Sequence, residues 1–485
     1  MGLRASLPHS GTSFFAAEAM VSIATPPATP SPELLRRFDI AGPRYTSYPT
    51  ADRFVEAFDD ADYGRVLEQT LGAPGRLATL SLYVHIPFCE SLCYYCACNK
   101  IITKHHSRGT LYLEYLAKEL ALHTATMGHK QSLGQLHLGG GSPTFLSDAE
   151  LAGLMQLLQH NFRFTPKAEI AIEVDPRTVT VARLRTLADL GFNRLSFGVQ
   201  DFDPDVQVAI HRVQSTQQVF DLVHAARERG LQSINIDLIY GLPKQTLASM
   251  ERTLAKVIEL RPDRIALYAY AHLPQRFKPQ RRIHAEDLPD GSTKVAMLAH
   301  ALEVLVGAGY VYVGMDHFAL PDDALAVAKR QGRLHRNFQG YSTRPDCDLI
   351  ALGVSSIGRI GNTYSQNAKT LEDYYALLDQ GRFPVVRGLA LSRDAMLRRT
   401  VIMALMCQGA VEFEVVSSAW MIDFAGYFAA ELRALQALAQ AGLVNLDAQG
   451  IRVSDTGWFF VRAIAMVFDS YLQEDLSRER FSRIV

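Results

Sequence analysis

Four cysteines lie close together, at Cys89, Cys93, Cys96 and Cys98, directly after the apolar segment Leu80 to Val84. The first three have the spacing C-x3-C-x2-C, which lets one short loop present three thiolates to three corners of a cubane iron-sulfur cluster. The fourth iron then has no local protein ligand and is left open to bind and reduce a cofactor. The spacing therefore predicts a redox-active cluster in this loop.

A structural zinc site is the main alternative for the cysteine loop. Structural zinc commonly uses two cysteine or histidine pairs separated by a longer loop. This chain has no second pair, because Cys347 and Cys407 stand alone. We therefore favour the iron-sulfur interpretation.

The composition describes an ordinary globular enzyme. The chain has 485 residues, of which 48% are hydrophobic and 20% charged, enough for one large core and a smaller domain. A net charge of −1 gives no general attraction to nucleic acid. Six cysteines with this distribution do not form a disulfide framework, so we expect a reducing, cytoplasmic location. No long window is apolar and free of charge, so we expect no membrane span.

The order of apolar patterns predicts the fold. Strand-like and amphipathic helical segments alternate from Leu80 onward, which is typical of parallel βα units. The expected strands are 80–85, 135–138, 169–173, 194–198, 233–239, 264–269 and 310–314. The expected helices lie near 109–127, 148–161, 181–190, 216–229, 246–260 and 293–308. Six or seven repeats predict an α/β fold with an open parallel (β/α)6-type partial TIM barrel.

We expect five segments along the chain. Residues 1–32 form a disordered extension, with Met20 as an alternative start, because ATPPATPSP is a proline-rich linker. Residues 33–75 form an N-terminal lid or arm, and residues 76–345 form the barrel. Residues 346–379 form a connection that contacts the cofactor, and residues 380–485 form a smaller, mostly helical C-terminal domain.

Chemically useful residues follow the predicted strands. The glycine run Gly139–Gly141 with Ser142 follows the second strand, Glu173 ends the third, Gln200 follows the fourth, and Asp237 lies late in the fifth. In parallel barrels the carboxyl ends of the strands meet on one face, so these groups should crowd one mouth.

Their residue types suit an amino-acid-containing nucleoside ligand. The glycines let the backbone approach a charged head group. Glu173, Gln200 and Asp237 can bond ribose hydroxyls and an ammonium, and Arg212 offers a planar fork for a carboxylate. Each residue alone could be a helix cap or a surface charge. Their shared placement favours one binding site.

The segment YVHIPFCESLCYYCACNK, from Tyr83 to Lys100, resembles the signature of the radical S-adenosylmethionine (SAM) superfamily. Within it, the chain is similar to the family of oxygen-independent coproporphyrinogen III oxidases, also called coproporphyrinogen dehydrogenases. The resemblance runs from about residue 34 to the C-terminal FSRIV. It includes the blocks GPRYTSYPTA (Gly42–Ala51), LHLGGGSPT, IEVDPR, FNRLSFGVQDF, NIDLIYGLPKQT, YAHLP, GMDHFA and HRNFQGYST.

The resemblance implies roles for individual residues. Cys89, Cys93 and Cys96 match the [4Fe-4S] ligands, and Cys98 matches a nearby cysteine that does not ligate the cluster. Two SAM molecules are implied. Positions that match SAM or cluster contacts are Tyr83, Tyr95, Gly140, Gly141, Ser142, Glu173, Gln200, Arg212, Asp237, Ala271 and Ile357.

The chain departs from the family pattern at three positions. Ser142 stands where Thr is usual, Tyr95 where Phe is common, and Ala97 where Gly is common. Ser142 keeps the hydroxyl and Tyr95 keeps the ring. A Cβ at Ala97 would disfavour a positive φ in a tight loop, which bears on the geometry of the cluster.

The implied reaction is the oxidative decarboxylation of two propionate side chains of coproporphyrinogen III to vinyl groups. A 5'-deoxyadenosyl radical made from SAM removes hydrogen from each propionate, and the product is protoporphyrinogen IX in haem biosynthesis. The resemblance also implies a cytoplasmic monomer, an external flavodoxin- or ferredoxin-like one-electron reductant and an unidentified electron acceptor. No nucleic-acid partner is expected.

A substrate with propionates needs cations, and a lid should exclude water from the radical. The lid candidates are Gly42–Ala51 and the C-terminal domain. Basic residues in the run QRFKPQRRIH, which begins at Gln275, follow the sixth strand. We expect Arg281 and Arg282 from this run, and Arg44 from the lid, to contact substrate carboxylates, although a solvated loop is an equal alternative.

Two related functions remain open. A non-catalytic haem-binding chaperone resembles this family and keeps the cluster and barrel, but generally lacks the fourth cysteine and the long N-terminal lid, which this chain has. A related radical enzyme that methylates or opens haem is disfavoured by the match through the C-terminal domain.

Overall fold

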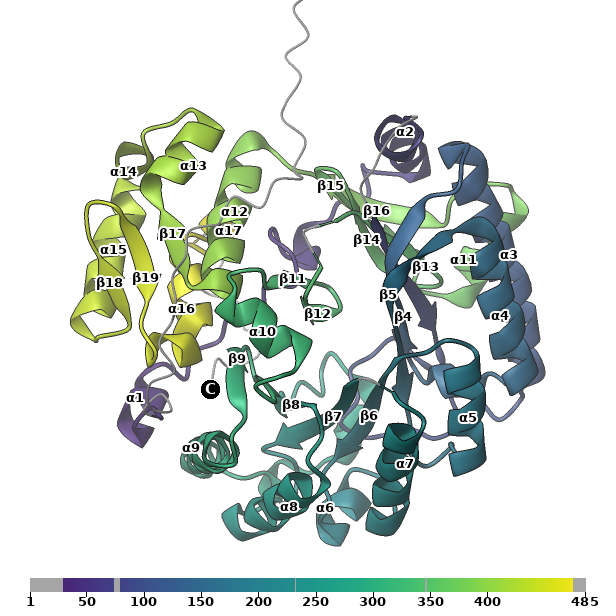
Figure 1. Ribbon diagram of the computed structural model, residues 1–485, viewed down its shortest axis with the longest axis horizontal. Coiled ribbons are helices and arrows are strands. Elements are labelled where there is room, and N and C mark those ends of the chain that lie inside the picture. The colour runs from purple at the N-terminus through teal and green to yellow at the C-terminus, as the bar shows by residue number, and fades with distance from the viewer. Residues whose placement is uncertain (1–28, 74–78, 232, 345–346, 474–485) are drawn as a thin grey trace, which may run out of the picture.

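The computed structural model describes residues 29–73, 79–231, 233–344 and 347–473. Its main feature is a twelve-stranded sheet in the order β16-β15-β14-β13-β1-β4-β5-β6-β7-β8-β10-β9 (Figure 1). The sheet curves around an open centre, and its two ends do not pair with each other. Within the described residues, no helix is long and apolar enough to cross a membrane.

The centre of the sheet is parallel, as predicted. Strands β13-β1-β4-β5-β6-β7-β8 all run in one direction. Their bounds are β1 Leu80–Ile86, β4 Ser132–Gly140, β5 Arg163–Val174, β6 Arg194–Gln200, β7 Ser233–Tyr240, β8 Arg264–Ala269 and β13 Leu349–Leu352. The α/β fold is therefore confirmed. Strand β13 was not predicted, because it is only four residues long and lacks a preceding helix of its own.

Antiparallel strands extend both ends of this parallel core. They are β14 Ile357–Ile360, β15 Thr363–Asn367 and β16 Val385–Ala390 beside β13, and β10 His317–Ala319 and β9 Val311–Gly314 beside β8. The segment 310–314 was expected as a seventh parallel repeat. It forms a strand that runs in the direction of β8 but does not pair with β8, because positive φ angles at Gly314, Met315 and Asp316 reverse the chain and β10 lies between the two strands.

Helices cover the outer face of the curved sheet (Figure 1). They are α3 Ser107–Met127, α4 Asp148–Asn161, α5 Val181–Asp189, α6 Pro204–Ala209, α7 Thr216–Glu228, α8 Leu247–Leu260 and α9 Gly291–Gly307. Local sequence determines where α4 begins, because Ser147 and Glu150 form a reciprocal capping box at its first turn. The apolar faces of these helices and of the strands form one large core.

The C-terminal region is mostly helical and lies at the open side of the arc (Figure 1). It contains α12 Arg393–Gln408, α13 Phe413–Trp420, α14 Phe424–Tyr427, α15 Ala429–Gln440, α16 Val461–Met466, α17 Ser470–Gln473, η5 Gly457–Phe460 and a small sheet of β17 Ala410–Glu412, β19 Gly450–Val453 and β18 Val444–Leu446. Strand β16 falls inside the range 380–485 expected for this domain, yet it belongs to the main sheet.

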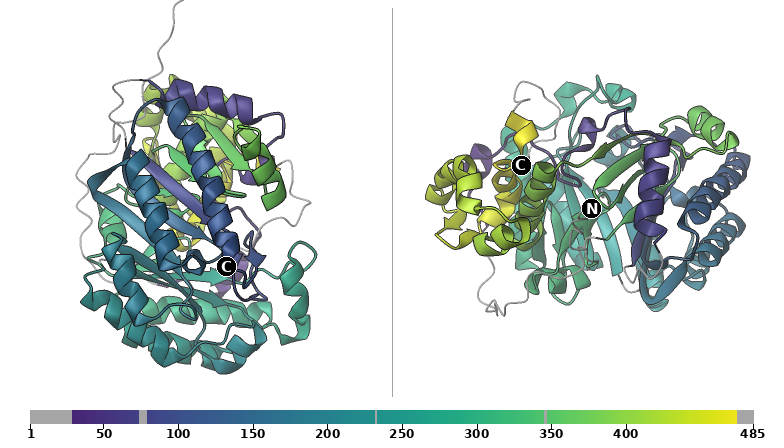
Figure 2. Two further views of the ribbon diagram at one scale, coloured as in Figure 1. Left: turned by 90° about the vertical axis from the view of Figure 1, so that its right-hand side faces the viewer. Right: turned by 90° about the horizontal axis from the view of Figure 1, so that it is seen from above.

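N-terminal segments run between the C-terminal region and the sheet (Figure 2). Tyr45 donates a hydrogen bond to Asp469 at 2.9 Å, and Val55 pairs with Gly388 of β16. The N-terminal elements are α1 Pro32–Arg37, η1 Ala51–Arg53 and α2 Asp60–Leu71, and α2 lies beside α3 (Figure 1). The expected disordered extension lies almost entirely outside the described residues. The five-segment division remains a prediction.

The remaining elements are short connections. They are β2 Phe88–Cys89, β3 Ile101–Ile102, η2 Pro143–Phe145, η3 Lys278–Arg282, η4 Ala285–Asp287, α10 Ala324–Arg330, β11 His335–Asn337, β12 Gly340–Ser342 and α11 Leu371–Asp379.

Candidate functional site

The cysteine loop follows β1 and is closed at its base by backbone pairing. Phe88 and Cys89 form β2, which pairs with β3, and the Thr103 amide donates to the Cys89 carbonyl at 3.0 Å. The amide of Tyr94 donates to Ile210 at 3.0 Å, which attaches the middle of the loop to the segment after α6. The loop is thus held at both its base and its middle.

The thiols of Cys89, Cys93 and Cys96 are electrostatic neighbours. Burial, and after it the neighbouring thiols of Cys96 and Cys93, raise the pKa of Cys89 to about 12. A hydrogen bond with Cys98 lowers the pKa of Cys96, and Lys100 adds to this effect. Cys98 is exposed, and the same bond with Cys96 raises its pKa.

Two arginines face the buried Cys93. Arg212 Nη1 lies 3.3 Å and Arg177 Nη2 lies 3.5 Å from the Cys93 sulfur. Asp175 holds both arginines, at 3.3 Å from Arg212 and 2.7 Å from Arg177. Arg212 also donates to the Gly198 carbonyl at 3.0 Å. This arrangement places positive charge beside the sulfur, where it would stabilise an anionic cluster.

The glycine run at the end of β4 packs directly against the cysteine loop. The Gly141 amide donates to Ile86 at 2.8 Å, and the Ser142 amide donates to Phe88 at 2.8 Å. A Cβ on Gly141 would lie 2.7 Å from the backbone of Pro87. Gly140 has φ +114°, a conformation that side chains rarely adopt. Packing against the cysteine loop therefore requires glycine here. The predicted approach of these glycines to a ligand head group stays a prediction.

Glu173 lies behind the glycine run. It accepts hydrogen bonds from the Gly140 amide at 3.2 Å and pairs with His137 at 3.2 Å. Burial alone would raise the pKa of Glu173, but the bonds from His137 and Gly140 outweigh burial and hold it below its usual value. The ring of Tyr83 stacks on His137, with centroids 5.9 Å apart, and its hydroxyl lies 3.1 Å from His85 Nδ1.

Gln200 ends β6, and Asp237 lies in the second half of β7. Gln200 adopts φ +69°, and a Cβ on Gly198 would lie 2.9 Å from its side-chain nitrogen and 3.0 Å from Arg212. Asp237 accepts from Ser196 at 3.1 Å. Burial, and then the charge of Glu173, raises the pKa of Asp237 to about 6. Glu173 and Arg212 both act on the charge of Asp237, and Gln200 and Arg212 both lie beside Gly198, so we call these four the cradle residues.

Sequence reasoning missed Gln280, which joins two parts of the site. Its side-chain nitrogen donates to the carbonyls of Tyr95 at 3.0 Å and Ala271 at 3.2 Å. It thereby ties the cysteine loop to the loop after β8. The only signal in the sequence was that Gln280 belongs to the basic run QRFKPQRRIH. Asp175 and Arg177 were also missed as individual residues, although they lie in the IEVDPR block.

The other expected residues lie further from these contacts. Ile357 begins β14 and packs with an apolar group that includes Phe54 and Tyr364. Arg44 forms a 2.7 Å ion pair with Asp316, and its guanidinium lies over the Tyr268 ring. Their contacts with cofactor or substrate stay predictions.

Arg281 and Arg282 are exposed on η3. Arg281 donates to the Pro274 carbonyl at 3.0 Å, and the guanidinium of Arg282 lies over the Tyr94 ring at 5.2 Å. Among the described residues, no carboxylate forms an ion pair with either arginine, so both cations can face an external group. Their predicted role towards substrate is not tested by these contacts.

The residues present fit a cluster of several irons. Each thiol would bind its own iron, so the thiols need not converge on one point as they would around a single ion. Within the described ranges, no three His, Cys, Asp or Glu side chains lie close enough to ligate one ion. Ala97 does not have a positive φ. Its Cβ therefore causes no backbone strain in the cysteine loop of the kind that replacing glycine was expected to cause.

The chain is similar to known proteins over nearly its whole length. Residues 83–257 match the radical SAM superfamily and residues 391–460 match the HemN C-terminal domain. An oxygen-independent coproporphyrinogen III oxidase from Pseudomonas aeruginosa is 49% identical, over 93% of this chain and 98% of the relative. The enzyme of that name from Escherichia coli is 47% identical, over 93% of this chain and 98% of the relative.

A solved structure agrees with this similarity. It is described as coproporphyrinogen III oxidase (HemN) from Escherichia coli, a radical SAM enzyme. Its TM-score is 0.85 at 47% identity, and the match covers 88% of this chain and 97% of that chain.

Proposed function

This chain belongs to the family of oxygen-independent coproporphyrinogen III oxidases, and from that membership we propose that it converts coproporphyrinogen III to protoporphyrinogen IX in haem biosynthesis. The reaction decarboxylates two propionate side chains oxidatively and leaves two vinyl groups. The observation that carries the proposal is the joint presence of the full-length similarity and the C-x3-C-x2-C loop at the carboxyl end of β1.

Cys89, Cys93 and Cys96 would hold a [4Fe-4S] cluster in this enzyme. Together with SAM, this group supplies the carbon radical that removes hydrogen from a propionate. Arg212 and Arg177 support the cluster by donating towards the Cys93 sulfur. Deprotonated thiols are needed as ligands, so the raised pKa of Cys89 means that cluster binding releases a proton.

The remaining cradle residues would orient two SAM molecules. Glu173 stays ionised because His137 and the Gly140 amide support its charge, so it can hold an ammonium. Gln200 and Asp237 offer groups for ribose hydroxyls. The other proposed contacts are Tyr83, Tyr95, Gly140, Gly141, Ser142, Arg212, Ala271 and Ile357. Cys98 lies near the cluster without ligating it.

Substrate carboxylates are proposed to meet Arg44, Arg281 and Arg282. Arg44 comes from the N-terminal arm that runs between the C-terminal region and the sheet, which suits a lid over the barrel mouth. A lid excludes water and oxygen from the radical. We propose a monomeric cytoplasmic enzyme that receives single electrons from a flavodoxin- or ferredoxin-like protein.

Product analysis after anaerobic reconstitution with iron and sulfide tests this function. The enzyme should convert coproporphyrinogen III to protoporphyrinogen IX when SAM and a reductant are present. Haem binding without any vinyl product would instead favour the chaperone alternative, which the names of the relatives do not support. Absence of both outcomes would refute the family-based function.

A further inference from the structure

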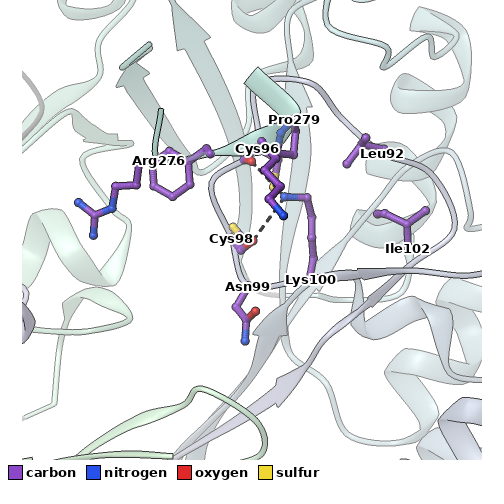
Figure 3. A pocket seen from close by; sticks show the side chains of 10 residues that line it. Leu92, Cys96, Cys98, Asn99, Lys100, Ile102, Arg276 and Pro279 are labelled. Atoms are coloured by element: carbon purple, nitrogen blue, oxygen red, sulfur yellow. Dashed lines mark hydrogen bonds between the residues drawn. The ribbon is translucent and has the colours of Figure 1, made fainter. Parts of the chain in front are cut away.

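A pocket of about 240 Å³ opens beside the cysteine loop (Figure 3). One wall consists of loop residues, and the other consists of residues that follow β8. The lining residues are Leu92, Cys96, Cys98, Asn99, Lys100, Ile102, Arg276, Phe277, Lys278 and Pro279. A proposed cluster ligand, Cys96, therefore forms part of the wall of a pocket that is open to solvent.

The charges around this pocket all have one sign. Lys100, Arg276 and Lys278 line it, and no lining residue is acidic. Arg276 and Lys278 are exposed, and Figure 3 shows Arg276 extending away from the cysteine loop. Within the described ranges none of these three cations forms an ion pair. The whole chain carries a net charge of only −1, so the positive charge here is a local concentration.

Further cations adjoin the pocket. Lys369 is exposed, and its pKa is lowered first by partial burial and then by the charges of Arg387 and Arg276. Its carbonyl accepts a hydrogen bond from the Asn99 side chain at 3.1 Å, which places it next to the cysteine loop. The basic surface thus continues past the pocket on the side of Lys369.

The centre of this surface is partly apolar. Leu92, Phe277, Pro279 and Ile102 contribute to the pocket, and Ile102 is 41% exposed. A small apolar centre surrounded by charges is typical of the weak, short-lived interfaces that electron-transfer proteins form. Charges around the rim accelerate the encounter with an oppositely charged partner.

We propose that this basic surface, formed by Lys100, Arg276, Lys278 and Lys369, is the docking site for an acidic one-electron carrier protein. The inference rests on the proposed function, which needs an external reductant. The carrier loses one electron and is oxidised by one step, and the cluster gains that electron and is reduced by one step. Because Cys96 lies in the pocket wall, the electron enters through the ligand nearest to the docked protein.

The surface is distinct from Arg44, the proposed substrate contact on the N-terminal arm. Arg44 is already paired with Asp316, whereas Arg276 and Lys278 face solvent. Arg281 and Arg282 follow Lys278 on η3 and are proposed to bind substrate carboxylates. The experiment below separates docking of the electron carrier from binding of substrate.

The test measures binding of a purified flavodoxin, an acidic FMN protein, to the reconstituted holoenzyme. The test variant combines Arg276→Glu with Lys278→Glu. The matched control combines Lys130→Glu with Arg229→Glu, two exposed residues that precede β4 and β7 and so lie at the opposite end of the parallel strands. Both double variants change the net charge by the same amount.

We expect the test variant to weaken flavodoxin binding about tenfold or more at low salt, and the control to leave the dissociation constant near that of the wild type. Wild-type affinity should fall as ionic strength rises. The rate of cluster reduction by reduced flavodoxin, divided by the rate with dithionite, should fall in the test variant only.

Equal affinities in the test variant and the wild type would overturn the docking site. So would equal weakening in the test and control variants, or wild-type binding that does not depend on salt. A higher KM for coproporphyrinogen III in the test variant, with flavodoxin binding unchanged, would assign the surface to substrate and also overturn it. Failure of the wild type to form product with dithionite would count against the proposed function instead, because flavodoxin binding is measured separately.

Discussion

Replacing Arg177 with Gln should make the cluster harder to reduce. The guanidinium of Arg177 lies 3.5 Å from the sulfur of Cys93, a proposed cluster ligand. Arg177 forms an ion pair with Asp175, which also pairs with Arg212. Replacing Arg177 therefore removes a positive charge near the sulfur and leaves the Asp175 carboxylate paired with Arg212 alone. Both changes disfavour an added electron.

The size of the effect follows from the distance. Coulomb's law with an effective dielectric constant of about 20 gives roughly 2 kcal/mol for a unit charge about 7 Å from the centre of the cluster. For a one-electron couple this free energy corresponds to roughly 90 mV. We therefore expect Arg177→Gln to shift the reduction potential by about 90 mV in the negative direction.

A redox titration followed by electron paramagnetic resonance measures this shift directly. Arg185→Gln is the matched control, because Arg185 is exposed on α5 and loses the same charge. Its potential should stay near that of the wild type. An unchanged or more positive potential in Arg177→Gln would refute the assigned role of Arg177, provided that iron content shows a full cluster.

Two further predictions concern the backbone and the core. Gly141→Ala should abolish measurable SAM binding and product formation, because the new Cβ would lie 2.7 Å from the Pro87 backbone. Equilibrium dialysis with labelled SAM measures the binding, and retained affinity would contradict this prediction. Glu119 is fully buried, and burial raises its pKa to about 7. Its stabilising contribution is therefore complete below the unfolded pKa, near 4.5, and is lost as the pH rises through about 7. Urea unfolding should show up to about 3 kcal/mol of this pH dependence in the wild type; the same dependence in Glu119→Gln would exclude Glu119 as its source.

The sequence predicted the elements whose patterns are local. Alternating apolar segments located the six parallel strands from β1 to β8 and the helices between them, and strand β8 was predicted with its observed bounds. Strand β13 escaped, because its partner β1 lies far away in the sequence and four apolar residues carry no clear periodicity.

The sequence predicted those site residues that lie on or directly after the parallel strands. The rule that parallel strands end on one face predicted that Glu173 and Asp237 would lie together, and the charge of Glu173 does act on Asp237 in the structure. The residues that join loops were not predictable in this way. Gln280 matters because its amide reaches the carbonyls of Tyr95 and Ala271, and no local pattern encodes that meeting.

Cleavage of SAM by the reduced, anaerobically reconstituted protein tests the central claim, that three thiolates leave one iron open to SAM. The measured quantity is 5'-deoxyadenosine formed by the wild type, Cys93→Ser and Cys98→Ser. The account predicts 5'-deoxyadenosine from the wild type and from Cys98→Ser, and none from Cys93→Ser. A wild-type cluster that never cleaves SAM, or undiminished cleavage in Cys93→Ser, would contradict it.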